Sequence, residues 1–200
     1  MLKIAVLVSG GGTNLQALID AQNRGEIIGG EISLVVSNKP DVYALERAKN
    51  AGIESVVVNR KEYDNASDFD TALCNVLTDN NIDLVVLAGF LCILGDNILK
   101  VYKNKIINVH PSLIPSFCGD GFYGLRVHKA ALDYGVKVTG ATVHFVNEIT
   151  DGGKIILQKA VEIKEGDTPE VLQKRVMEEA EWKILPQAVS LYCQGKIKAE

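Results

Sequence analysis

Runs of apolar, often β-branched residues alternate along the first half of the chain with segments in which apolar residues recur at helical spacing. This alternation is typical of strand–helix units that build a parallel sheet. The predicted strands are almost continuously apolar, as expected when helices cover both faces of a sheet. Strands are predicted over residues 3–9, 32–37, 55–58, 83–88 and 106–109, and helices over residues 14–24, 42–51, 68–80 and 96–103.

The second half of the chain has a different pattern. A helix is predicted over residues 125–134, followed by strands over 138–147 and 155–163. The turn Thr150–Gly153 separates these strands, so they are expected to pair antiparallel. The sequence therefore predicts an α/β fold: a doubly wound, mostly parallel sheet with helices on both faces and an antiparallel hairpin in the C-terminal half.

One more long segment, from Thr168 towards Gly195, is amphipathic. Pro169 is suited to the first turn of a helix, and Glu170 follows it there. Pro186 lies inside the pattern and is expected to kink or interrupt the helix, since proline removes a helical hydrogen bond.

The length of 200 residues is typical of one compact domain. We expect a single domain over residues 1–200, with a Rossmann-like, phosphate-binding half over 1–100 and a catalytic half over 101–200. No stretch approaches the roughly 20 apolar residues that a membrane-spanning helix needs, so no membrane partner is expected. Monomer and homodimer both stay open.

Charge and cysteine content narrow the class of protein. Lysine and arginine number 21 against 25 aspartates and glutamates, so the surface does not favour a polyanion and nucleic acid is not expected as a partner. The four cysteines, at positions 74, 92, 118 and 193, form no Cys-x-x-Cys pair. Neither a metal site nor a disulfide framework is indicated, and reduced thiols in a cytoplasmic protein are expected.

A glycine-rich turn, Ser9–Asn14, connects the first predicted strand to the first predicted helix. Backbone N–H groups at a helix start bind anions, and glycine lets a phosphate approach closely. A dinucleotide site is disfavoured because Leu15 stands where Gly-x-Gly-x-x-Gly needs its last glycine. A pocket for one terminal phosphate is the preferred interpretation, and a tight turn without ligand is the alternative.

Asn108 and His110 are two residues apart on the last strand of the first half. Their side chains should therefore point the same way, near the carboxyl edge of the sheet where ligand sites collect. An amide that donates to a carbonyl oxygen, beside an imidazole that titrates near neutrality, suits attack on an acyl carbon. The alternative is a polar strand end bonded only to loop backbone.

Asp151 is a candidate carboxylate for the same site. It lies in the turn Thr150–Gly153, whose glycines permit a tight reversal of the chain. A carboxylate near His110 would raise the pKa of the imidazole and favour its protonated form.

These motifs resemble the folate-dependent formyltransferases, and the resemblance spans nearly the whole chain. The residues that carry it are Ser9–Leu15, Leu87–Phe90, Asn108–Pro115, Thr142–Val146, Asp151–Gly153, and Glu181 ahead of Pro186. The resemblance implies transfer of a formyl group from 10-formyltetrahydrofolate, as cosubstrate, to the amine of 5-phosphoribosylglycinamide in purine synthesis, without a metal.

The resemblance also implies roles for individual residues. Asn108, His110 and Asp151 are the implied catalytic trio, with His110 as the acid–base residue. Glu181 is implied to contact the amine side of the substrate. The implied phosphate ligands are Gly12, Thr13 and Asn14. The implied folate slot consists of Leu91, Cys92, Ile93, Leu94, Asn108, Asn147, Glu148, Ile149, Thr150 and Asp151.

The sequence departs from the family where Cys92 and Ala66 stand, since arginine is frequent at both positions. Contacts to the glutamate tail of the folate are the part of the site that these departures affect. Three other activities are alternatives: hydrolysis of 10-formyltetrahydrofolate, formyl transfer to initiator methionyl-tRNA, and nucleotide sensing without catalysis. The glycine turn, the acidic charge and the presence of the whole trio, respectively, argue against them.

Overall fold

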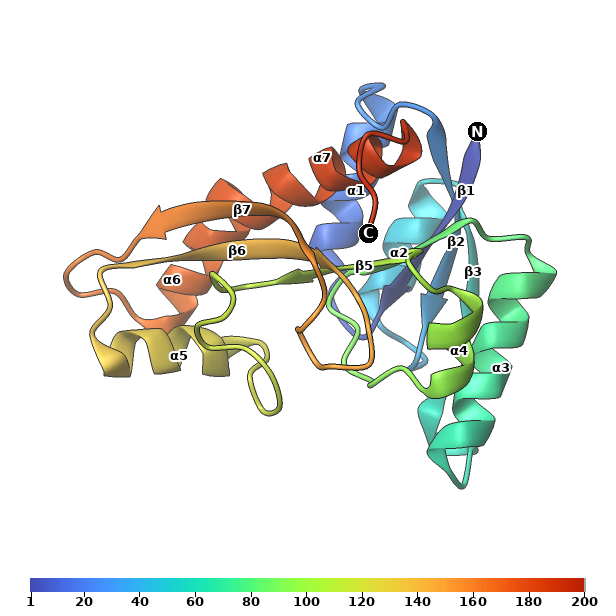
Figure 1. The fold of residues 1–200 in the computed structure, drawn as a ribbon, viewed down its shortest axis with the longest axis horizontal. Coiled ribbons are helices and arrows are strands. Elements are labelled where there is room, and N and C mark those ends of the chain that lie inside the picture. Colours follow the sequence, from blue (N-terminus) through green and yellow to red (C-terminus); the bar gives the residue numbers. More distant parts are fainter. Residues whose placement is uncertain (200) are drawn as a thin grey trace.

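One mixed sheet forms the centre of the molecule (Figure 1), and the computed structural model describes residues 1–199. The strands within that range are β1 (Leu2–Val8), β2 (Gly30–Ser37), β3 (Glu54–Val57), β4 (Leu84–Leu87), β5 (Ile106–His110), β6 (Val138–Phe145) and β7 (Ile155–Glu162). Their order across the sheet is β3-β2-β1-β4-β5-β6-β7. The chain thus runs outwards from β1 to β3, then returns to pair β4 against the other side of β1.

The first five strands are parallel, and β6 and β7 pair antiparallel as predicted. The doubly wound α/β sheet is therefore confirmed. β6 also pairs antiparallel with β5, a contact that the sequence pattern did not predict. In this register Asn108 on β5 lies opposite His144 on β6. Figure 1 shows β6 and β7 as a long pair extending from the rest of the sheet.

Helices cover both faces of the sheet, as predicted. They are α1 (Thr13–Asn23), α2 (Tyr43–Asn50), α3 (Ala66–Asp79), α4 (Asp96–Val101), α5 (Leu125–Tyr134), α6 (Pro169–Val176) and α7 (Trp182–Cys193). A short 3₁₀ turn, Arg60–Glu62, precedes α3 and was not predicted. Most of the predicted helices and strands begin and end within a few residues of the observed bounds.

Successive side chains of β1 point to opposite faces of the sheet, and this alternation explains why the core has two layers, one on each face. Ile4, Val6 and Val8 pack with buried residues of α1, α2, α6 and α7. Ala5 and Leu7 point to the opposite face and pack with buried residues of α3 and α4. Both sets are almost completely removed from solvent, which accounts for the continuous apolar character of the strand.

The long C-terminal helix is interrupted, but one turn before the predicted place. A π-helical segment, Met177–Glu181, separates α6 from α7, and Pro186 lies inside α7. The interruption therefore precedes α7, and Pro186, which lacks the N–H for one helical bond, is accommodated inside α7. No helix of the described residues is long and apolar enough to cross a membrane.

Candidate active site

A cavity of about 490 Å³ lies at the carboxyl ends of the parallel strands. We refer to it as the cleft. It is lined by residues that follow β4 and β5, at the point where the strand order reverses around β1. Ligands in doubly wound sheets bind at such a switch point. The N–H of Leu91 donates to the Ser9 hydroxyl (2.8 Å), which ties the loop after β4 to the glycine turn after β1.

Most of the predicted site residues line this one cleft. They are Asn14, Leu91, Cys92, Ile93, Leu94, Asn108, His110, Asn147, Glu148, Ile149, Thr150, Asp151 and Glu181. Gly12 and Thr13 do not line it themselves, but they immediately precede Asn14 at the start of α1. The structure thus brings residues from both halves of the chain to one place.

The predicted trio is assembled by two elements. β5 carries Asn108 and His110, and the turn after β6 carries Asp151. The His110 Nδ1 atom lies 3.5 Å from the Asp151 Oδ2 atom, and both side chains are largely buried. An imidazole and a carboxylate are thus paired beside an amide, an arrangement that can accept a proton and stabilise an oxyanion.

Tight backbone geometry places Asp151. Its own φ is 55°, and the N–H of Gly119 donates to its Oδ2 atom (2.8 Å). A Cβ on Gly153 would lie 1.7 Å from the Phe145 carbonyl oxygen, so only glycine permits this close return of the chain onto β6. The turn glycines therefore act as expected from the sequence.

The pKa of His110 differs in direction from the prediction. Burial lowers the pKa of the imidazole below its ordinary value, and nearby His144 lowers it further. Asp151 and the Phe117 carbonyl oppose this lowering, as predicted for the carboxylate, but they do not outweigh it. The Nε2 atom lies 2.9 Å from the Phe117 carbonyl oxygen and so carries the proton of the neutral ring. His110 is therefore suited to accept a proton at Nδ1.

His144, for which the sequence favours a partly buried strand position over one beside the catalytic residues, contacts the trio. This histidine is almost completely buried, and its Nδ1 atom bonds the Phe145 carbonyl (2.7 Å). Its Nε2 atom lies 3.1 Å from Asn108 Nδ2 and 3.7 Å from Asp151 Oδ1. The apolar pattern of β6 is the signal that could have revealed this contact. Once β5 and β6 pair, the strand places His144 opposite Asn108.

The ionised state of Asp151 is favoured overall. Burial raises the pKa of its carboxyl, but the neighbouring imidazoles of His144 and His110 more than offset burial. The N–H of Gly119 acts in the same direction, so the net pKa lies below the ordinary value. A carboxylate held ionised can balance a positive charge that forms on a neighbouring ring.

At the glycine turn, Gly12 is in the left-handed conformation with a φ of 71°. A Cβ at this position would approach the Ala44 Cβ to 2.7 Å, so α2 packs directly against the turn. The first intrahelical bond of α1 runs from the Gln16 N–H to the Gly12 carbonyl (2.9 Å). The N–H groups before Gln16 are thus at a helix start, where an anion binds favourably.

Asn14 and Glu181 form a buried pair between α1 and the π segment. The Asn14 amide donates to Glu181 Oε2 (2.6 Å), and the Asn14 Oδ1 atom is buried without a partner among the described residues. Burial raises the pKa of Glu181 to about 7, against the opposing effect of the Asn14 hydrogen bond. An amide oxygen without a donor, next to a carboxyl group, provides places for a polar ligand.

His128 is more buried than the sequence suggested. From the sequence, a histidine beside Lys129 in a predicted helix favours a surface or helix-packing role, but the side chain, on α5, has no exposed area. Neither ring nitrogen has a hydrogen-bond partner among the described residues. Burial, together with the nearby His110 imidazole, lowers the pKa of His128 to about 4. The buried position means that the packing role is correct and the surface role is wrong.

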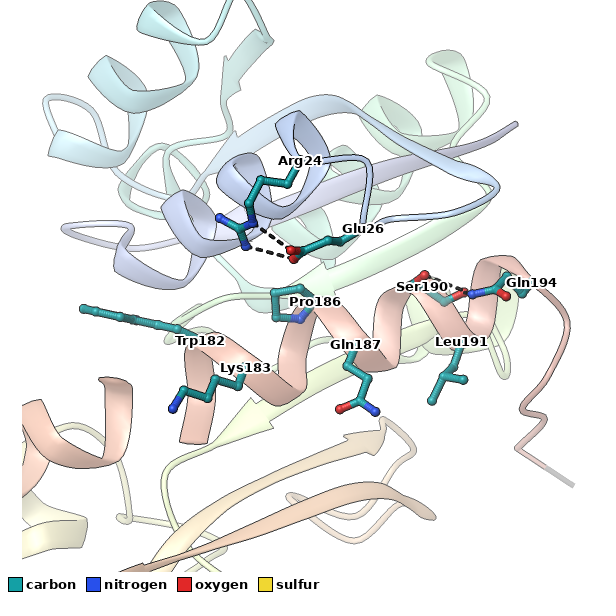
Figure 2. Close-up of a pocket in the computed structure, with 9 residues that line it drawn as sticks. All are labelled: Arg24, Glu26, Trp182, Lys183, Pro186, Gln187, Ser190, Leu191 and Gln194. Atoms are coloured by element: carbon teal, nitrogen blue, oxygen red, sulfur yellow. Dashed lines mark hydrogen bonds and ion pairs between the residues drawn. The ribbon is translucent and has the colours of Figure 1, made fainter. Parts of the chain in front are cut away.

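A second depression, of about 380 Å³, contains none of the predicted site residues (Figure 2). It lies between the Arg24–Glu26 ion pair after α1 and the side chains of α7, among them Gln187. Within residues 1–199, no group of three or more histidine, cysteine, aspartate or glutamate side chains could hold a metal ion. The chemistry-bearing side chains therefore converge on the cleft.

Comparison with known proteins agrees with this chemistry. The family model described as formyl transferase matches residues 2–189. The fold and the site thus define the class, and the chain belongs to the formyl transferase family.

Within that family the chain is similar to one kind of enzyme. It is 41% identical to a phosphoribosylglycinamide formyltransferase of Haemophilus influenzae, over 99% of this chain and 90% of that protein. The crystal structure of glycinamide ribonucleotide transformylase 1 from Symbiobacterium toebii has a TM-score of 0.92 and 43% identity, covering 98% of this chain and 89% of that one. A trifunctional purine biosynthetic protein of Homo sapiens is 46% identical over 98% of this chain. This chain spans only 19% of that longer relative.

Proposed function

We propose that the chain transfers the formyl group of 10-formyltetrahydrofolate to the amine of 5-phosphoribosylglycinamide, a step of purine synthesis. The observation that carries the proposal is the convergence of Asn108, His110 and Asp151 in a cleft that also reaches Asn14 and Glu181. The similarity to phosphoribosylglycinamide formyltransferases over nearly all of the chain supports the choice of acceptor.

The reaction joins the acceptor nitrogen to the formyl carbon and then breaks the bond between that carbon and N10 of the folate. The neutral amine attacks, and the carbonyl oxygen becomes an oxyanion in a tetrahedral intermediate. The Asn108 amide donates to this oxyanion, which lowers the barrier because the charge develops only as the reaction proceeds. The collapse of the intermediate releases tetrahydrofolate and the formylated amine.

One proton must leave the attacking nitrogen and one must reach N10. The free lone pair of neutral His110 is on Nδ1, because Nε2 bonds the Phe117 carbonyl. A proton taken up there, directly or through water, faces the Asp151 carboxylate at 3.5 Å. The ion pair stabilises the transient imidazolium, which then returns a proton to N10.

The glycine turn would hold the phosphate of the acceptor through Gly12, Thr13 and Asn14. The Asn14 side chain donates to Glu181, so the contribution of Asn14 to phosphate binding is through its backbone N–H at the start of α1. Glu181 and the free Asn14 Oδ1 atom would contact polar groups between the phosphate and the amine.

The folate ring would lie between the segment Leu91–Leu94 and the turn Asn147–Asp151. Exposed apolar side chains line the cleft in these two segments, at Leu91, Ile93 and Ile149. Such a lining fits a flat, mostly apolar ring system. Polar groups at the ring edge would be met by backbone N–H and C=O groups of the same segments.

The whole chain is proposed to act as one domain on small molecules in the cytoplasm. Two observations support the first part: the cleft draws residues from both halves, and one sheet runs through both. One relative, from Arabidopsis thaliana, is named as chloroplastic.

An acceptor comparison tests the proposal. Purified protein is mixed with 10-formyltetrahydrofolate and one of three acceptors: phosphoribosylglycinamide, its dephosphorylated form, or initiator methionyl-tRNA. Mass spectrometry of the acceptors then detects formylation. We expect formylation of phosphoribosylglycinamide and at least tenfold slower reaction, on the order of 1.4 kcal/mol, with the form that lacks the phosphate. Faster formylation of methionyl-tRNA, or no formylation of any acceptor, would contradict the proposal.

A further inference from the structure

Helix α2 packs against one side of the glycine turn, Ser9–Asn14. Arg47 lies on α2 and is partly buried. Its Nε atom donates to the Gly11 carbonyl oxygen (2.8 Å), and its terminal nitrogen donates to the Gln16 side-chain oxygen (2.9 Å). The guanidinium group also lies over the Tyr43 ring, 4.8 Å from the centroid. Arg47 therefore joins the turn, α1 and α2.

Three consecutive carbonyl groups of the turn are occupied by the protein itself. Gly10 accepts from the Ala44 N–H (3.1 Å), Gly11 accepts from Arg47, and Gly12 accepts from the Gln16 N–H (2.9 Å). In a trans peptide the N–H points away from the C=O of the same unit. The N–H groups of Gly11, Gly12 and Thr13 therefore point away from these three donors.

The space in front of the turn is open. A Cβ on Gly10 or Gly11 would meet nothing within 4 Å, whereas one on Gly12 would strike Ala44 on the α2 side. The carbonyls thus face protein and successive N–H groups face the open side. Such a row of N–H groups is an anion-binding concavity.

We propose that Arg47 is a positioning residue for phosphate recognition. It acts through the Gly11 peptide: its bond to the carbonyl fixes the peptide with the Gly12 N–H outwards, and its charge polarises that N–H as a donor. Arg47 contributes from behind the turn and does not contact the phosphate. This inference rests on the proposed function, because it requires a phosphate at the turn.

Kinetics of three variants test the proposal. Arg47→Ala removes both the bond and the charge, Arg47→Lys keeps the charge but loses the planar pair of donors, and Lys49→Ala removes an exposed charge from the same helix. For Arg47→Ala we expect the KM for the phosphorylated amine to rise on the order of tenfold, with kcat and the KM for the formyl donor within about twofold of the parent. Arg47→Lys should lie between Arg47→Ala and the parent, and Lys49→Ala should match the parent.

The dephosphorylated amine separates phosphate recognition from general damage to the fold. For this acceptor, the parent and Arg47→Ala should have the same kcat/KM. An equal loss with both acceptors, or an unchanged KM for the phosphorylated amine in Arg47→Ala, overturns the proposal. So does a loss in Lys49→Ala as large as in Arg47→Ala.

A binding measurement keeps this inference distinct from the proposed activity. Inorganic phosphate is titrated calorimetrically into the folate-free parent, Arg47→Ala and Lys49→Ala proteins. We expect weaker phosphate binding in Arg47→Ala alone, on the order of tenfold. If the parent binds phosphate but formylates no amine, the proposed function fails and the titration alone decides the role of Arg47. Equal phosphate affinity in the parent and Arg47→Ala, or no phosphate binding by the parent, overturns the proposal for Arg47.

Discussion

Each nitrogen of the His110 ring faces a different partner, and this asymmetry assigns the chemistry. The Phe117 carbonyl holds the proton on Nε2, while Nδ1 faces the ionised Asp151 carboxylate. Burial keeps the pKa of the ring below its ordinary value, so the neutral form is present at neutral pH. A neutral ring has a free lone pair with which to accept a proton, and the carboxylate stabilises the charge that results.

Replacing either of the two β5 side chains should therefore reduce turnover with the fold preserved. For Asn108→Ala and for His110→Ala we expect kcat to fall by a factor on the order of a hundred or more, because each removes a group that acts on the transition state. Steady-state assays measure this loss, and the thermal midpoint checks folding. Asn75→Ala, on the exposed side of α3, serves as the control and should leave kcat unchanged. Turnover near that of the parent in either β5 variant contradicts the assigned roles.

His128 should make the protein less stable in acid. Its pKa of about 4 lies below the ordinary value of 6.5, so between these values the unfolded chain binds a proton that the folded chain does not. The free energy of unfolding should thus fall as the pH drops from 6.5 towards 4, by on the order of 3 kcal/mol from this residue.

The variant His128→Leu removes this titration and places an apolar side chain of similar size in the buried position. Urea unfolding at several pH values between 4.5 and 7.5 measures the effect. The stability of the variant should decline less steeply with acid than that of the parent. Parallel curves for the two proteins would show that His128 does not titrate as described.

The sequence allowed Asn108 and His110 to be placed on one side of a strand, since strand side chains alternate strictly. It also singled out Asp151, but not its distance to His110, because that distance depends on a turn folding back from another strand. The burial of His128 was missed for a related reason: a histidine beside a lysine in a helix reads as polar, and only tertiary packing shows which face is covered.

The contact between the glycine turn and α2 makes one glycine different from the others. A side chain at Gly12 meets both an unfavourable φ of 71° and the Ala44 Cβ at 2.7 Å. Gly25, after the end of α1, has a similar φ of 73° but nothing within 4 Å of a Cβ. The pair separates backbone strain from steric overlap.

We expect Gly25→Ala to cost about 1 kcal/mol of unfolding free energy and Gly12→Ala about 2 kcal/mol or more, since overlap adds to the same strain. Chemical denaturation of the two variants measures this difference. Only Gly12→Ala should also raise the KM for the phosphorylated amine. Equal stability losses in the two variants would mean that α2 yields to the added methyl group.

The pattern of apolar residues was sufficient to predict which segments form helices and strands and their order along the chain. It was not sufficient to predict how every element pairs or where it is interrupted. The parallel direction of the strands in the first half follows from strand–helix alternation, whereas their order across the sheet does not. The antiparallel pairing of β5 with β6 does not follow from it either, because α5 lies between them in the chain and either direction of pairing was possible. Likewise, Pro186 predicted an interruption of the last helix, but the structure has the interruption at Met177–Glu181, ahead of the helix that contains the proline.

At the scale of the whole molecule, one cleft brings together the proposed phosphate-binding turn and the proposed catalytic trio, whose residues lie far apart in the sequence. The glycine turn and the segment after β4 come from the first half, whereas β5, the Asp151 turn and Glu181 come from the second. An acceptor held by its phosphate at one end of the cleft can present its amine to a formyl group beside the trio. This geometry predicts that the donor reacts with the bound amine in preference to water.

The ratio of the two products tests this account most directly. Tetrahydrofolate release is followed by absorbance, and the formylated amine is quantified by mass spectrometry in the same reaction. We expect one formylated amine for each tetrahydrofolate released, and no release above the uncatalysed rate when phosphoribosylglycinamide is omitted. Release of tetrahydrofolate at the same rate without the amine would identify water as the acceptor and would contradict the account.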